Sequence, residues 1–228
     1  MSDHQLDQKL GQAPDQEPEP QPGQQPYDDV AEVYAEKFSD SLTKYPLERG
    51  LLSAFAEWAT AAGGRVADLG CGPGHVTAYL SSLGLDAFGV DVSSGMIAQA
   101  RARNPELRFE VGSMAALDIP DASLGGIVSR YSIIHTPPED VPAILAEFRR
   151  VLAPGGCALI SFPGTDDAEP PTVSYDHSVF TAYRWWPDHF SALLAEAGIE
   201  EVGRLIERAV PEAPRPYPVV NLFAHRQA

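Results

Sequence analysis

Glycines at positions 70, 72 and 74, followed by the acidic Asp91, have the spacing of a nucleoside-binding crevice. They belong to the run Val66-Ala-Asp-Leu-Gly-Cys-Gly-Pro-Gly74 and to the apolar stretch after it. Glycine permits the tight turns and close backbone approaches that a bound ligand needs. An acidic side chain about 20 residues beyond such glycines can accept hydrogen bonds from both hydroxyls of a ribose. The pattern therefore predicts a site for a cofactor that contains a nucleoside.

The elements around these residues are those of a βαβ unit. Arg65–Leu69 is a short apolar run that indicates a buried strand, and the helix after it has apolar residues at helical spacing. Ala87–Val90 indicates the next strand, which ends at Asp91. Ligands of such units lie beyond the carboxyl ends of the parallel strands, so we expect the glycines and Asp91 to face one crevice.

Two nucleoside cofactors compete for this crevice, and the glycine spacing distinguishes them. The dinucleotide fingerprint is G-x-G-x-x-G, in which the third glycine lets helix and strand pack closely. His75 takes that position when the count starts at Gly70, and Thr77 takes it when the count starts at Gly72. The missing third glycine argues against an NAD(P)-dependent oxidoreductase, which is kept as the alternative.

The remaining pattern, D-x-G-x-G-x-G with Asp68 on the strand, resembles motif I of the class I S-adenosylmethionine-dependent methyltransferases. The resemblance runs from Arg65 to Phe162 and includes Phe148-Arg-Arg-Val-Leu-Ala-Pro-Gly-Gly156, a phrase typical of the family. It implies S-adenosyl-L-methionine as cofactor and S-adenosyl-L-homocysteine as product. It also implies an α/β fold with a Rossmann-like doubly wound sheet, mostly parallel with an antiparallel C-terminal strand, and helices on both faces.

The same resemblance places the cofactor contacts in the glycine loop and at the ends of the following strands. They are expected at Asp68, Gly70, Cys71, Gly72, Gly74, Asp91, Val92, Met96, Ser113, Met114 and Arg130. The family usually has an acidic residue where this chain has Ser113, so we expect a backbone group or the Met114 amide to recognise adenine. It also commonly has an Asp where this chain has Gly126. For Met96, ordinary packing in the core is the alternative.

Methyl transfer demands little beyond positioning, because the cofactor already carries the activated group. A general base helps where the acceptor is a hydroxyl or an amine. His135 is the candidate, with Tyr131 in the same loop after the fourth strand, because histidine titrates near neutral pH. His177 and Tyr175 are the lower-ranked alternatives. The alternative is an imidazole that caps the next helix or lies in solvent. The cysteines and histidines do not have metal-ligand spacing, so we expect an enzyme that needs no metal.

Two segments outside the core are expected to bind the acceptor. Residues 27–60 are predicted to form an N-terminal helical lid, and residues 164–186 an acidic, proline-containing insertion. The candidate substrate contacts are Tyr27, Tyr34, Tyr175, His177 and Trp185. Aromatic rings suit a ring-bearing acceptor and, through cation–π contact, a sulfonium. The alternatives are rings that pack the lid on the core and a solvent-facing connection.

The rest of the chain supplies further elements of the expected sheet. A helix begins near Ser93, and the helix from Val141 to Leu152 has a continuous apolar face. Strands are expected at 107–111, 127–130 and 157–162, then a helix that ends at Gly198 and strands at 202–207 and 219–225. Their order resembles the antiparallel closing pair of the family.

Composition limits the domains and the partners. The chain has 228 residues, enough for one core-bearing domain, here 61–228. Residues 1–26, rich in Gln, Pro and acidic side chains, predict a disordered tail. The formal net charge of -16 repels phosphate backbones. We therefore expect a small-molecule acceptor, neutral or cationic, and no nucleic acid.

No apolar run is long enough to cross a bilayer and no signal peptide is recognisable, so no membrane partner is expected. Cys71 and Cys157 give no disulfide framework, which indicates the cytoplasm. The sequence does not indicate an oligomeric state. The leading hypothesis is a small-molecule methyltransferase, and the alternatives are the oxidoreductase and a noncatalytic protein that binds the nucleoside as a sensor or scaffold.

Overall fold

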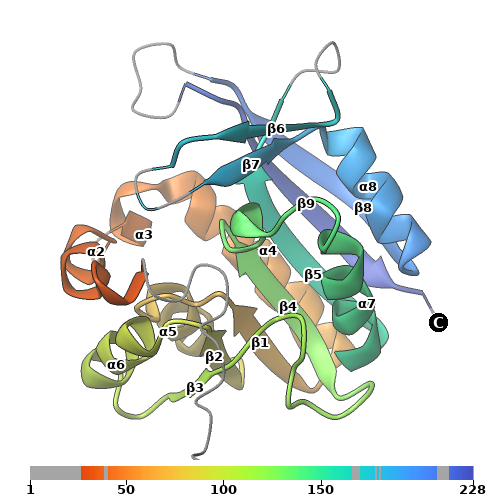
Figure 1. Ribbon diagram of the computed structural model, residues 1–228. Helices are drawn as coiled ribbons and strands as arrows, with labels where there is room; N and C mark the ends of the chain where they lie inside the picture. The colour runs from red at the N-terminus through yellow and green to blue at the C-terminus, as the bar shows by residue number, and fades with distance from the viewer. Residues whose placement is uncertain are drawn as a thin grey trace, which may run out of the picture.

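The computed structural model describes residues 27–38, 41–165, 170–177, 179, 181–209 and 216–227. The predicted disordered tail, residues 1–26, lies outside these residues. A seven-stranded sheet with helices on both faces forms the centre of the described part (Figure 1). The strand order is β3-β2-β1-β4-β5-β9-β8.

One strand of the sheet runs against the others. The strands are β1 (Arg65–Leu69), β2 (Ala87–Asp91), β3 (Arg108–Val111), β4 (Leu124–Arg130), β5 (Leu152–Pro163), β8 (Ile199–Glu207) and β9 (Val219–Arg226). β1 to β5 pair in parallel, whereas β9 lies between β5 and β8 and is antiparallel to both. This topology confirms the predicted doubly wound sheet with an antiparallel C-terminal strand. The strand order reverses between β1 and β4, where such sheets place their ligands.

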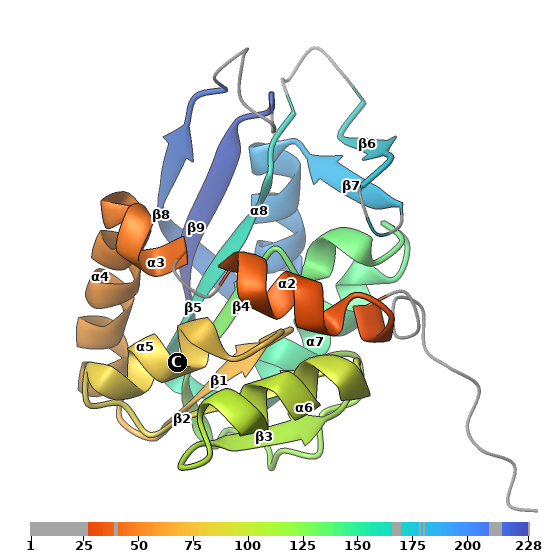
Figure 2. The same ribbon diagram turned by 90° about the vertical axis from the view of Figure 1, so that its left-hand side faces the viewer.

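Helices cover both faces of the sheet (Figure 2). α4 (Pro46–Ala62), α5 (His75–Ser82) and α6 (Ser94–Arg103) lie on one face, and α7 (Val141–Val151) and α8 (Pro187–Glu196) lie on the other. The hydroxyl of Ser93 caps α6 by accepting a hydrogen bond from the Met96 N–H at 3.0 Å. In the described part of the chain, the helices are too short or too polar to span a bilayer.

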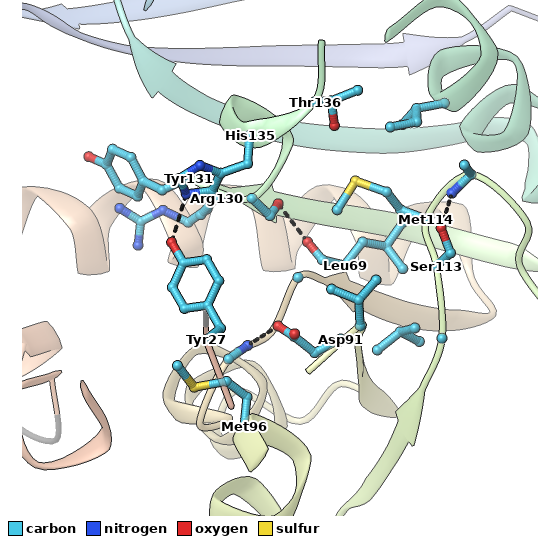
Figure 3. A pocket seen from close by; sticks show the side chains of 18 of the residues that line it. Tyr27, Leu69, Asp91, Met96, Ser113, Met114, Arg130, Tyr131, His135 and Thr136 are labelled. Carbon is cyan, nitrogen blue, oxygen red and sulfur yellow. Dashed lines mark hydrogen bonds between the residues drawn. The ribbon is translucent and has the colours of Figure 1, made fainter. Parts of the chain in front are cut away.

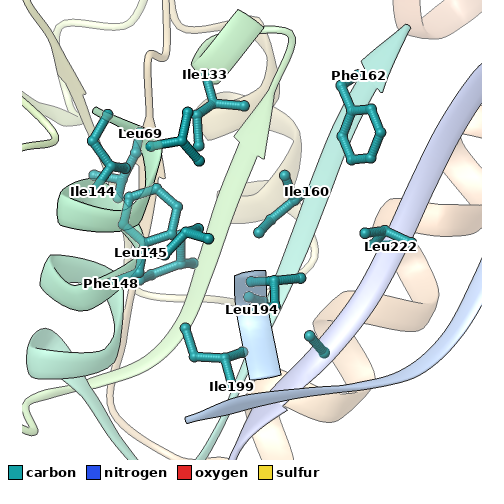
Figure 4. Packing of buried hydrophobic residues seen from close by; sticks show 14 of the residues in the cluster. Leu69, Ile133, Ile144, Leu145, Phe148, Ile160, Phe162, Leu194, Ile199 and Leu222 are labelled. Carbon is teal, nitrogen blue, oxygen red and sulfur yellow. The ribbon is translucent and has the colours of Figure 1, made fainter. Parts of the chain in front are cut away.

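The apolar face of α7 forms part of the largest hydrophobic cluster (Figure 4). Leu145 and Phe148 are fully buried, as the helical spacing predicts. They share the cluster with Ile160 of β5 and Leu194 of α8. Full burial of one such side chain contributes about 1.5–3 kcal/mol. This packing fixes the position of α7, whose first turn borders the crevice.

The predicted N-terminal lid divides into two parts. α4 buries Leu52, Phe55 and Ala59 in one cluster with Val66 of β1, so this helix belongs to the core. α3 (Ser41–Lys44) precedes it, and α2 (Ala31–Phe38) lies beside α6. α4 differs from α2 because its apolar face packs on β4 and β5 of the sheet. The segment 27–38 is the part of the predicted lid that borders the crevice.

The insertion of residues 164–186 contains a β-hairpin where the sequence predicted a loop. β6 (Thr172–Tyr175) and β7 (Ala182–Trp185) pair antiparallel, with Thr172 opposite Trp185. The Trp186 N–H donates to the Pro171 carbonyl at 2.8 Å and continues the ladder. The strands have only four residues each, and only the first, Thr172–Tyr175, alternates polar and apolar residues, so the sequence signal for a hairpin is short.

The start of β5 also differs from the expected boundary. The strand begins at Leu152, directly after α7, whereas the sequence indicated Cys157. The run Pro154-Gly155-Gly156 lies within it, where the pairing of β4 with β5 is irregular. Proline and glycine weaken a strand pattern, which explains why the sequence placed its start later.

Candidate active site

A cavity of about 340 Å³ opens beyond the carboxyl ends of β1, β2 and β4 (Figure 3). Its walls come from the glycine loop, the loops after β2, β3 and β4, the first turns of α7, and the segment that contains α2. Asp91, Met96, Met114, Tyr27 and His135 lie around one space, although their positions in the chain are far apart. The crevice that the glycines and Asp91 predicted is thus present.

Asp91 ends β2 with its carboxylate at the cavity. Its Oδ2 accepts a hydrogen bond from the Gly72 N–H at 2.8 Å, and its Oδ1 accepts one from the Ser93 N–H at 2.9 Å. A carboxylate has about four lone-pair sites, so each oxygen retains acceptor capacity for a ligand hydroxyl. Burial raises the pKa of Asp91, the N–H groups of Ser93 and Gly72 lower it, and Asp28 raises it. The site therefore suits a ligand that donates hydrogen bonds.

Gly70 makes the closest contact of the glycine loop. Its φ is +77°, and a Cβ at this position would lie 2.1 Å from the Cβ of Ser132. The Ser132 hydroxyl donates to the Leu69 carbonyl at 2.8 Å and lies 2.8 Å from the Ser129 hydroxyl. Because Ser132 follows β4 and Gly70 follows β1, this contact holds together the two loops at which the strand order reverses.

Tyr131 turns the chain at the end of β4. Its φ of +54° is in the left-handed region, which residues other than glycine seldom adopt. Its N–H donates to the Ser161 carbonyl at 2.8 Å, which keeps the residue attached to β5. The turn brings Ser132 next to Gly70 and places Tyr131 at the cavity. Strained residues of this kind concentrate at functional sites.

Arg130 brings a buried positive charge to the cavity wall. Its side chain is 7% exposed, and its Nη2 lies 3.2 Å from the Glu48 carboxylate of α4. Its Nε donates to the Ser161 hydroxyl at 3.4 Å. The charge is thus balanced within the protein, as a buried charge requires.

His135 ends the short helix η1 (Ile133–His135) and is held from both sides. Its Nδ1 lies 2.9 Å from the Thr181 carbonyl oxygen, which only accepts, so Nδ1 carries the ring proton. Nε2 therefore accepts a hydrogen bond from the Tyr27 hydroxyl at 2.7 Å. Burial lowers the pKa of His135 to about 4, the Thr181 contact opposes this, and His177 adds to it. The imidazole is consequently neutral at pH 7.

Comparison with known proteins identifies the family. A family described as "Methyltransferase domain" matches residues 66–156. Trans-aconitate 2-methyltransferase of Methylobacterium nodulans is 36% identical over 141 residues, which cover 60% of this chain and 50% of that protein. Demethylmenaquinone methyltransferase of Beutenbergia cavernae is 30% identical over 202 residues, which cover 74% of this chain and 83% of that protein. The chain belongs to the class I S-adenosylmethionine-dependent methyltransferases.

This membership confirms the family and the cofactor that the resemblance implied, and it argues against the dinucleotide alternative. The chain spans half the length of the first of these relatives and most of the second. A solved structure of Burkholderia thailandensis 1,6-didemethyltoxoflavin-N1-methyltransferase, with S-adenosylhomocysteine and 1,6-didemethyltoxoflavin bound, superimposes with a TM-score of 0.63. It is 21% identical and covers 87% of this chain and 88% of that one, which shows a common fold.

Most residues predicted to bind ligands line this cavity. They are Tyr27, Tyr34, Gly70, Gly72, Asp91, Val92, Met96, Ser113, Met114, Arg130, Tyr131 and His135. Met96 is 2% exposed and so contributes both to the core and to the wall. The other predicted residues lie behind this wall; they are Asp68, Cys71, Gly74, Tyr175, His177 and Trp185.

Asp68 lies behind the glycine loop. Its side chain accepts a hydrogen bond from the Thr77 hydroxyl at 2.7 Å, and burial raises its pKa to about 7. It therefore attaches α5 to β1 and has no direct contact with the cavity. Cys71 is 4% exposed, and a Cβ at Gly74 would lie 2.7 Å from the ring of Phe109. Both are packing positions, which is the reason they do not line the cavity.

The hairpin residues lie behind His135. The ring of His177 is centred 5.1 Å from that of His135, and the ring of Tyr175 is centred 6.3 Å from that of His177. His177 thus packs against the imidazole and Tyr175 packs against His177, and neither residue is among those that line the cavity. Trp185 is 1% exposed, with its ring 5.3 Å from that of Phe190. It anchors the hairpin to the core, so we do not assign it to substrate binding.

Other residues build the site without having been predicted from the sequence. Ser132 and Thr181 act through hydrogen bonds to Leu69 and His135, which are distant in the chain, and no local pattern marks them. Glu48 balances Arg130, and a buried arginine indicates only that some acidic partner exists. For Asp28 the sequence did offer an indication, because this acidic residue directly follows the candidate site residue Tyr27.

Proposed function

We propose that the protein transfers a methyl group from S-adenosylmethionine to a small-molecule acceptor inside this cavity. The observation that carries the proposal is the Asp91 carboxylate, held between the N–H groups of Gly72 and Ser93 at the carboxyl end of β2. Each of its oxygens retains acceptor capacity on the cavity side. The two hydroxyls of a ribose would donate to these oxygens.

The residues around Asp91 fit the rest of the cofactor. Met96, Val92 and Met114 offer apolar surface to a purine ring, and the loop at Ser113 offers polar groups to its edge. A Cβ at Gly72 would meet no atom within 4 Å, so open space lies over the glycine loop for the methionyl part. The aromatic rings at the cavity suit a sulfonium.

The cofactor, when bound, supplies an activated methyl group. The protein's own part is to hold the acceptor atom in line with that methyl group and to exclude water. Such positioning can contribute about 7–11 kcal/mol toward lowering the barrier. We assign the acceptor to the side of the cavity formed by Tyr131, Pro137 and Ile144.

Tyr27 and His135 are the pair that we assign to removal of the acceptor's proton. The acceptor atom becomes more acidic as its bond to the methyl carbon forms. Its proton passes to the Tyr27 oxygen while the Tyr27 proton passes to Nε2 of His135, along the 2.7 Å hydrogen bond. The pKa near 4 keeps Nε2 unprotonated beforehand, and the Thr181 carbonyl continues to hold Nδ1–H.

The acceptor is proposed to be a small molecule and not a nucleic acid. The relatives are named for trans-aconitate and demethylmenaquinone, and the solved structure holds 1,6-didemethyltoxoflavin. The net charge of -16 repels phosphate backbones. The positive charge of Arg130 at the wall is already balanced by Glu48.

The proposal is tested by methyl transfer from S-adenosylmethionine with a deuterated methyl group to a panel of acceptors. The panel contains a polycarboxylate, a hydroquinone and a heteroaromatic N–H compound. We expect one of them to gain the heavy methyl group, with an equal amount of S-adenosylhomocysteine formed. Asp91→Ala at the same concentrations is the control. Cofactor binding by the wild type, with transfer no faster than in this control, would support the noncatalytic alternative.

A further inference from the structure

Asp28 joins the segment beside the cavity to the start of α6. Its Oδ1 accepts hydrogen bonds from the Ser93 hydroxyl at 2.6 Å and from the Gly95 N–H at 2.7 Å. The Ser94 hydroxyl adds a longer contact of 3.4 Å to Oδ2. A carboxylate at this end of a helix is stabilised by the unpaired N–H groups there. Asp28 is thus a cap for α6 that comes from a different part of the chain.

The start of α6 also holds Asp91. Ser93 is fully buried, and it donates its N–H to Asp91 and its hydroxyl to Asp28. One residue therefore connects the carboxylate assigned to the cofactor with the carboxylate that holds the N-terminal segment.

Gly95 leaves room for this contact. A Cβ at position 95 would lie 3.1 Å from the Cβ of Ala31 and 3.1 Å from the Cα of Asp28, closer than side chains ordinarily pack. Ala31 and Ala35 are the buried residues of α2, and both are small. α2 therefore lies close along α6, as Figure 2 shows.

Tyr27, the neighbour of Asp28, holds the other side of the cavity. Its hydroxyl contacts His135 in the loop after β4, whereas Asp28 contacts the helix after β2. Tyr34 of α2 also lines the cavity, with its ring centre 5.9 Å from that of Tyr27. Figure 3 shows the contact of Tyr27 with His135. Together with the contact of Asp28 with Gly95, it fastens the segment 27–38 to two separate walls.

We propose that Asp28 is a positioning residue that holds the segment 27–38 closed over the bound cofactor and so sets the rate at which the cofactor leaves. The proposal rests on the proposed function, since it requires S-adenosylmethionine and its product to bind in this cavity. Loss of the Asp28 carboxylate exposes the Ser93 hydroxyl and the Gly95 N–H to water. It leaves the Ser93 cap on Met96 in place, so α6 is retained.

The test is the dissociation rate of radiolabelled S-adenosylhomocysteine from the full chain, measured after addition of excess unlabelled ligand. We expect Asp28→Ala to raise this rate about tenfold, the scale of a lost hydrogen bond to a charged group. Asp28→Asn keeps one acceptor oxygen and should give an intermediate rate. Asp29→Ala, at the exposed neighbouring position, is the matched control and should change the rate less than about twofold.

A second variant tests the docking without altering the carboxylate. Gly95→Val places bulk against Ala31 and Asp28 and should also speed dissociation. A further readout is trypsin cleavage after Lys37, an exposed residue of α2. Bound S-adenosylhomocysteine should protect this bond in the wild type and protect it much less in Asp28→Ala. A role confined to folding would not produce this dependence on ligand.

Equal dissociation rates for the wild type, Asp28→Ala and Gly95→Val would overturn the role of Asp28 and leave the proposed function standing. A folded wild-type chain that does not bind S-adenosylhomocysteine would overturn both. Faster dissociation from Asp28→Ala and Gly95→Val, with Asp29→Ala unchanged, would establish the positioning role.

Discussion

The hydroxyl of Tyr27 lies 2.7 Å from Nε2 of His135, and the two rings meet edge to face with their centres 5.4 Å apart. This contact joins the segment before α2 to the loop after β4. Since the Thr181 carbonyl holds the opposite ring nitrogen, the imidazole has one tautomer, and its Nε2 lone pair points to the Tyr27 hydroxyl. The pair therefore offers a defined route for a proton at the wall of the cavity.

His135→Ala should slow methyl transfer about 100-fold at saturating cofactor, the lower end of what a general base contributes. Tyr27→Phe removes the hydroxyl of the relay and should slow transfer as well. His225→Ala, on β9 far from the cavity, is the control and should leave the rate unchanged. A wild-type rate in His135→Ala would end the assignment of this pair.

The pH dependence of the rate should follow from the lowered pKa of His135, about 4 in the folded protein. The base is active when neutral, so the rate should stay level from pH 8 to about pH 5 and fall only as the pH approaches 4. An ordinary histidine would lose activity already near pH 6.5. A midpoint at 6.5 that disappears in His135→Ala would contradict the buried, neutral state of this imidazole.

Gly70→Ala should destabilise the protein by more than about 3 kcal/mol, because it combines a strained φ with a clash against Ser132. Gly155→Ala is the matched control, since Gly155 has a similar φ of +78° and open space around it. This change should cost about 1 kcal/mol. Denaturant unfolding of both variants measures their free energies of unfolding. Equal decreases in the two variants would show that the clash of the new Cβ with Ser132 does not destabilise the protein.

Asp68→Asn should change the pH dependence of stability. The folded pKa of Asp68 is raised to about 7, so the folded state binds a proton more tightly than the unfolded state does. The protonated carboxyl therefore stabilises the fold at low pH, and this stabilisation is lost as the pH rises from about 4 to 7. The asparagine variant does not titrate, so its stability relative to the wild type should increase by about 4 kcal/mol across that range. Asp86→Asn is the control, because Asp86 precedes β2 and its side chain is exposed. A constant difference between pH 4 and 7 would contradict the raised pKa.

The sequence predicted the elements whose own pattern is strong. The helix with Leu145 and Phe148 on one face, and the short apolar strands before Gly70 and Asp91, lie where the pattern placed them. Asp91 was predicted to face the cavity because it ends a parallel strand next to the reversal of the strand order. These conclusions need only local spacing and the direction of the strands.

Contacts between distant segments could not be predicted in this way. The hydrogen bonds of Tyr27 with His135 and of Asp28 with Gly95 join residues 108 and 67 positions apart, and no local pattern specifies either pair. Trp185 illustrates the opposite error, because an aromatic residue in a polar insertion suggested a substrate contact and the fold buries it instead. Burial depends on which elements pack together, which a single segment does not reveal.

Asp91 is proposed to hold the ribose of S-adenosylmethionine, and calorimetric titration of the wild type and Asp91→Ala measures this contact. We predict that the wild type binds S-adenosylmethionine and not NADH, and that the variant remains folded and loses about 1.5–3 kcal/mol of binding free energy. Asp86→Ala should bind as the wild type does. Binding of NADH alone, or equal affinity for S-adenosylmethionine in a folded Asp91→Ala variant, would contradict the claim.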